Sequence, residues 1–186
     1  GMRQSVKRVK SHQVDGFDWK SVPVRFGRRR EPAFSSEYYQ NVLANPKSSD
    51  SQKLKAAITL AWNQRVDGLS LKHAKPWPWA DMAPLVRIVV PRLGVSQIVL
   101  SNSSGRTLAF GPAHLSGTGF PGEVGHSVVT GHRDTHFRFL KDMDVDDVIR
   151  VQKADGIYVE FVVIGTNVFD ARAAHFAEAE ARKILK

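Results

Sequence analysis

The sequence of 186 residues contains no cysteine and no long apolar run. Without cysteine, the chain cannot by itself form a disulfide, a thiolate metal site or a cysteine nucleophile. No stretch is long and apolar enough to predict a transmembrane helix, and no short apolar signal core follows the basic start. We therefore expect a soluble chain. With 42% hydrophobic residues it is long enough for one domain with a real core.

The positive charge is concentrated at the start of the chain. Residues 1–30 carry nine Lys or Arg against two Asp, whereas the rest of the chain carries 18 basic and 16 acidic side chains. The pattern predicts a solvated basic arm, with attraction to a membrane surface through acidic headgroups as the alternative. Since the remainder is nearly neutral, an arm-driven nucleic-acid binder is the weakest hypothesis, and no nucleic acid is expected as a partner.

Two regions are expected on either side of Ser49. Residues 1–48 show little periodicity, which predicts a basic, loosely ordered N-terminal arm or short docked pieces. Ser49 and Gln52 then form a plausible capping box, which favours a helix over residues 50–68. Its apolar residues recur at helical spacing, which makes the helix amphipathic. We expect it to pack against the domain, the alternative being a stalk from a membrane anchor.

Residues 49–186 are expected to form one mainly β domain. "LVRIVV" (85–90) and "VSQIVL" (95–100) predict strands joined through Pro91 and Gly94, and residues 126–132 predict a third strand. Asp155 and Gly156 indicate the turn of a later hairpin, so the strands extend over about 85–169. The glycine-rich segment 105–125 predicts an irregular connection, residues 137–140 one short helical turn, and the Ala-rich tail a helix over about 171–183. This pattern favours an antiparallel barrel or sandwich.

The candidate functional segment is "VVTGHRDTHF", residues 128–137. A metal site at His132 and His136 is disfavoured, because Arg133 would oppose a dication and Gly131 indicates a strand end rather than a helix. An imidazole just past a strand end suits acid–base catalysis beside a nucleophile. A histidine on a rim is also common as a surface or hydrogen-bonded residue, and spacing alone leaves both interpretations open.

Three tracts, "PWPWAD", "GRTLAFGP" and "GHRDTHF", occur here in an order that resembles the sortase family of cysteine transpeptidases, and most closely its proteobacterial branch. The resemblance covers about residues 50–170. It implies a closed, mostly antiparallel β-barrel of eight strands with a cysteine nucleophile on the seventh. That cysteine attacks the Thr-Gly bond of a sorting signal resembling Leu-Pro-x-Thr-Gly, forms a thioester and passes the acyl group to an amine.

The resemblance also implies roles for individual residues. His132 matches the catalytic histidine, which donates a proton to the leaving amine. The neighbouring tract is expected to orient the loop and line the substrate groove, or to form a hydrogen-bonded turn without catalytic duty; it comprises Arg133, Asp134, Thr135 and His136. His114 and His126 are expected to be structural.

The sequence departs from the family at its C-terminus. Sortases place the cysteine in a "T-x-T-C"-like segment and an arginine on the eighth strand, whereas this sequence ends at "ARKILK". The nucleophilic cysteine and partner arginine are absent, so we expect an incomplete barrel and an inactive chain as given. Open barrel edges would allow self-association. The alternative is that the basic arm provides part of the missing barrel, with "SVPVRF" (21–26) as the candidate strand.

The functional hypothesis is thus a sortase-like transpeptidase or peptidase whose partner is the sorting-signal peptide of a surface protein. The alternative is a non-catalytic homologue that binds such a peptide or an envelope partner. No cofactor is expected, since calcium, used by some relatives, needs clustered carboxylates that are not evident here. The resemblance implies a cell-envelope location on the outer side of the cytoplasmic membrane. The sorting motif and the amine acceptor are left open.

Overall fold

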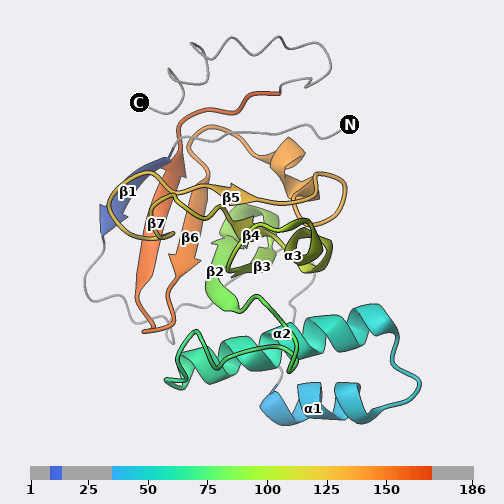
Figure 1. The fold of residues 1–186 in the computed structure, drawn as a ribbon. Helices are drawn as coiled ribbons and strands as arrows, with labels where there is room; N and C mark the ends of the chain where they lie inside the picture. The colour runs from blue at the N-terminus through green and yellow to red at the C-terminus, as the bar shows by residue number, and fades with distance from the viewer. Residues whose placement is uncertain (1–8, 14–34, 169–186) are drawn as a thin grey trace.

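The computed structural model describes residues 9–13 and 35–168, which form a curled sheet with two helices beside it (Figure 1). The sheet has seven strands in the order β1-β7-β6-β2-β3-β4-β5. In chain order the elements are β1 (Val9–Gln13), α1 (Ser36–Ala44), α2 (Asp50–Val66), β2 (Pro84–Val90), η1 (Pro91–Leu93), β3 (Val95–Leu100), α3 (Gly105–Phe110), β4 (Ala113–His114), β5 (Val129–Thr130), η2 (Arg138–Asp142), β6 (Val148–Gln152) and β7 (Tyr158–Val163).

The mainly β, barrel-like prediction is confirmed. Among the described strand pairs only β3 with β4 is parallel, and the others are antiparallel. Val129 of β5 and Phe161 of β7 both pack on a cluster formed by Val86, Val99 and Val151, although β5 and β7 lie far apart in the strand order. Side chains from distant strands can meet in this way because the sheet curls around its apolar face.

The two expected hairpins form where the turn residues predicted them. Gly94 has φ +62° between β2 and β3, and Gly156 has φ +85° between β6 and β7. A side chain at either position would be strained, because L residues rarely adopt positive φ. The Asp155 carboxylate accepts a hydrogen bond from the Ile157 N–H at 3.0 Å, which closes the second turn.

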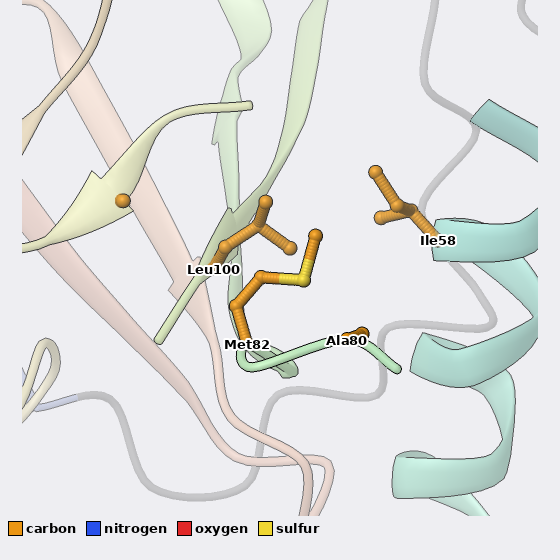
Figure 2. Packing of buried hydrophobic residues seen from close by; sticks show 5 residues of the cluster. Ile58, Ala80, Met82 and Leu100 are labelled. Carbon is orange, nitrogen blue, oxygen red and sulfur yellow. The ribbon is translucent and has the colours of Figure 1, made fainter. Parts of the chain in front are cut away.

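Helix α2 packs between α1 and the sheet (Figure 1). The predicted capping box is confirmed: Ser49 Oγ accepts from Gln52 N–H at 3.2 Å, and Gln52 Oε1 accepts from Ser49 N–H at 2.8 Å. Ile58 points from α2 toward Leu100 at the end of β3 and toward Met82 in the segment before β2 (Figure 2). The helix is therefore docked on the domain, as predicted.

The region expected to be a loose arm contains two ordered elements. Ser35 accepts a hydrogen bond from Tyr38 N–H and starts α1, and Ser36 Oγ accepts from Asn63 Nδ2 of α2 at 3.2 Å. Strand β1 pairs with β7 over residues 9–13, so the arm supplies a sheet strand. The low periodicity hid both elements because α1 buries none of its side chains and β1 depends on a distant partner strand. The candidate strand 21–26 and the expected helix 171–183 lie outside the described residues.

Two boundaries within the domain differ from the expectation. The segment 105–125 contains the helix α3, which starts where Ser104 Oγ accepts from Thr107 N–H at 3.2 Å, and the short strand β4. The expected strand 126–132 is reduced to the two residues of β5. Glycine density masked α3, whereas the length of β5 depends on its pairing with β4. The predicted helical turn after Phe137 is present as η2.

An ion pair joins η1 to the turn before β6. Arg92 donates from Nε and Nη2 to the two carboxylate oxygens of Asp147, which is 7% exposed, and the Nη2–Oδ2 distance is 2.6 Å. Arg92 Nη2 also lies 3.2 Å from Asp144 Oδ2. The hydrogen bond with Asp147 raises the pKa of Arg92 despite its desolvation. These contacts between Arg92 and Asp147 tie two distant turns together.

Replacing Asp147 with asparagine is expected to lower the melting temperature by several degrees. The variant keeps the size of the side chain but removes the charge that pairs with Arg92. Thermal unfolding followed by circular dichroism measures the effect. Asp144→Asn is the matched control, because Asp144 is 81% exposed and should contribute little. Equal melting temperatures for the two variants would contradict a structural role for the Asp147 pair.

Candidate functional site

His132 lies two residues beyond β5, at the rim of the sheet. Strand β5 is held by antiparallel pairing with β4, in which Thr130 lies opposite Ala113 and Val129 opposite His114. Thr130 Oγ1 also donates to the Ala113 carbonyl oxygen at 3.4 Å. The position of the histidine is therefore set by a backbone that is anchored to the sheet just before it.

The loop after His132 folds back on itself. The Phe137 N–H donates to the His132 carbonyl oxygen at 3.0 Å, and the Arg138 N–H donates to the Thr135 carbonyl oxygen at 3.3 Å. The Phe137 ring covers Gly131 so closely that a Cβ atom there would lie 3.0 Å from it. Glycine at this position thus allows the aromatic ring to hold the loop against the strand end.

The structure brings together three of the five candidate residues of the tract, namely His132, Thr135 and His136. The ring centroids of His132 and His136 are 6.3 Å apart, and Thr135 Oγ1 lies 3.5 Å from His136 Nδ1. His132, Arg133, Asp134 and Thr135 are exposed, whereas His136 is partly buried. Within the described part of the chain, Arg133 and Asp134 form no side-chain hydrogen bond or ion pair. Their predicted role in orienting the loop stays a prediction.

An open depression of about 400 Å³ adjoins His136. It lies between the start of β3 and the loop that carries His132. Its lining residues are Val95, Gln97, Thr135, His136, Arg138, Phe139, Lys141 and Asp142. Only Thr135 and His136 of this lining belong to the tract, and residue type alone did not indicate the contributions of β3 and η2. Arg138 follows Thr135 by three residues, which is a helical spacing, and this was the one signal in the sequence that could have placed Arg138 beside the tract.

Burial lowers the pKa of His136, and the neighbouring His132 lowers it further. Since the folded pKa lies below 6.5, the unfolded chain binds more protons in the window just below pH 6.5. The stabilisation due to neutral His136 is therefore present above pH 6.5 and is lost as the pH falls through the folded pKa. NMR titration of the imidazole signals should show His136 titrating below 6.5, and a midpoint at or above that value would contradict this environment.

His114 has the contacts of a structural histidine. Its Nε2 lies 2.9 Å from the Gly119 carbonyl oxygen and 3.0 Å from Thr118 Oγ1. Because a carbonyl oxygen only accepts, Nε2 carries the proton. The His126 carbonyl oxygen accepts from the Gly119 N–H at 2.7 Å, so His114 at the end of β4 and His126 before β5 both contact the loop that joins these strands.

Among the described residues, no three His, Asp or Glu side chains gather in an arrangement that could bind a metal ion. The described helices include none with the length and apolar character needed to cross a membrane.

The fold and site together define a class: a curled, mainly antiparallel β domain with an exposed histidine at its rim, held by the strand before it. The family model of the Sortase domain matches residues 88–186, which include this strand and His132. Because the match covers more than half of the chain, the protein belongs to the sortase family. Sortases are generally cell-envelope transpeptidases.

Solved structures that resemble the chain are also sortases. Sortase A from Corynebacterium diphtheriae is 24% identical over 71% of each chain, with a TM-score of 0.44. Group B Streptococcus Pilus Island 1 Sortase C2 is 24% identical over 67% of this chain and 80% of its own, with a TM-score of 0.43. Sortase C-1 from Actinomyces oris is 27% identical over 60% and 72%, with a TM-score of 0.38. A comparison with curated proteins finds no match.

Proposed function

We propose that this chain provides the acid–base part of a sortase-type transpeptidase and that His132 is its catalytic residue. The observation that carries the proposal is the placement of His132: its side chain is exposed, its backbone follows an anchored strand, and it lies in the part of the chain that matches the Sortase domain. The substrate is a sorting-signal peptide of the Leu-Pro-x-Thr-Gly kind. The sequence contains no cysteine, so the thiolate has to come from outside these residues.

In the proposed chemistry His132 first donates a proton to the leaving amine and later accepts one from the incoming amine. A thiolate attacks the carbonyl carbon of the Thr-Gly bond, and the His132 imidazolium gives a proton to the departing amine as the C–N bond breaks. The resulting thioester is attacked by a second amine, whose proton returns to the neutral His132 as the C–S bond breaks. An exposed imidazole is suited to this cycle, because both the leaving and the incoming amine must reach it.

The proposed setting is the outer side of the cytoplasmic membrane, where the basic residues 1–30 would be attracted to acidic headgroups. A second candidate function is the binding of a sorting-signal peptide or envelope partner without cleavage. The absence of cysteine from these 186 residues favours this candidate, since peptide binding needs no thioester.

The test is the intact mass of the protein isolated from its native source, combined with thiol labelling. An antibody raised against the domain would capture the native species. A mass above 20.7 kDa with one reactive thiol that a sorting-signal peptide acylates would support the transpeptidase. A native species of this mass without a thiol would overturn it and leave peptide binding as the function to measure.

A further inference from the structure

The depression beside His136 has the charge of an anion site. Arg138 and Lys141 line it, and neither side chain forms an ion pair with any of the residues that the structure describes. The lining also contains one carboxylate, that of Asp142, and Arg92 Nη2 donates to the main-chain carbonyl oxygen of the same residue at 2.6 Å. The depression thus carries two cations against one carboxylate, and this excess of positive charge favours an anionic ligand group.

The remaining lining residues suit a small ligand with both polar and aliphatic parts. Thr135 and Gln97 offer a hydroxyl and an amide, which can donate hydrogen bonds to a carboxylate. Val95 and Phe139 provide apolar surface for a short aliphatic chain. The volume of about 400 Å³ lies within the range of small-molecule sites.

The depression also adjoins the catalytic candidate. His136 forms part of its wall, and the centroid of its ring lies 6.3 Å from that of His132. The main chain between the two sites is short and held, since the Phe137 N–H donates to the His132 carbonyl oxygen. A ligand in the depression can therefore contact His136, whose ring neighbours that of His132.

We infer that this depression binds the acyl acceptor, and that the acceptor is an amine that carries a carboxylate group. This inference rests on the proposed function. Arg138 and Lys141 bind the carboxylate by charge-assisted hydrogen bonds, which leaves the amine itself free. The amine nitrogen then attacks the thioester carbonyl carbon, its proton passes to His132, and the thiolate departs. Recognition through the carboxylate selects the acceptor without occupying its reactive group.

The experiment compares L-lysine with cadaverine, which has the same amines and chain but no carboxylate. Each is titrated into the 15N-labelled chain at constant ionic strength while the backbone amide and imidazole signals are recorded. We expect L-lysine to shift the amides of residues 135–141 and the His132 ring, and cadaverine to leave them unchanged. The double variant Arg138→Gln with Lys141→Gln should weaken lysine binding by about tenfold or more.

The matched control is Lys72→Gln, which removes an exposed cation that does not line the depression. It should bind lysine as the unaltered chain does. Equal shifts with cadaverine, or unchanged lysine binding in the double variant, would overturn the inference. Both substituted side chains are exposed, so the double variant is expected to fold. A well-dispersed NMR spectrum of the variant checks this. Binding does not need the thiol, so failure of the transpeptidase proposal would be seen separately in the mass and labelling experiment.

Discussion

Replacing His132 with alanine, in a native species that carries the proposed thiol, is expected to lower the rate of transpeptidation by a factor of about 10² to 10⁴. The variant removes the imidazole that, in the proposed mechanism, protonates the leaving amine and later accepts the proton of the incoming one. Its melting temperature should stay nearly unchanged, since the His132 side chain is exposed. The rate is measured by release of the leaving peptide from a sorting-signal substrate and by formation of the new amide.

The matched control for this experiment is His126→Ala. His126 lies before β5 rather than after it, its side chain is exposed, and its described hydrogen bond is made by the main-chain carbonyl. Removing its imidazole should therefore leave the rate within about threefold, as for a surface substitution away from the site. An activity of the His132→Ala protein above one tenth of the original, or an equal loss in the His126→Ala protein, would rule out the assigned role.

Replacing Leu100 with alanine is expected to lower the free energy of unfolding by about 3 to 5 kcal/mol. Leu100 is fully buried, and it packs where the α2 layer meets the sheet, among Ile58, Met82 and Ala113 (Figure 2). The substitution leaves a cavity that the surrounding elements cannot close completely, because β3 is held between two partner strands. Urea denaturation of the chain, followed by circular dichroism, measures the change.

Leu115→Ala is the control for the cavity. It makes the same chemical change at a side chain that is 40% exposed, so a loss below about 1 kcal/mol is expected. A loss of similar size for both variants, or a loss below 1 kcal/mol for Leu100→Ala, would contradict the packing of α2 on the sheet.

The elements that could be predicted are those with local causes. The capping box of Ser49 and Gln52 started α2 as expected, since both hydrogen bonds involve residues three apart. The turns at Gly94 and Gly156 also followed from residue type, because a positive φ favours glycine. Alternating or continuous apolar runs then identified β2, β3, β6 and β7 from the residues themselves.

The elements that were missed depend on partners far away in the chain. Strand β1 exists through its pairing with β7, and no periodicity in residues 1–48 indicated it. The brevity of β5 follows from its pairing with a two-residue strand, and the parallel contact of Leu100 with Ala113 sets the place of β4. Backbone pairing of this kind is decided by the whole sheet, so residue propensity alone does not reveal it.

The candidate site also has features that follow from the sequence and features that follow only from the tertiary structure. The sequence by itself determined the family resemblance, the place of His132 after a strand and the absence of a cysteine, because each is a property of residue type and order. Only the tertiary structure decided that β3 contributes Gln97 to the depression that His136, Arg138 and Lys141 also line. These groups meet because the curled sheet brings the start of β3 next to the loop beyond β5, and such proximity arises only when the strands pair.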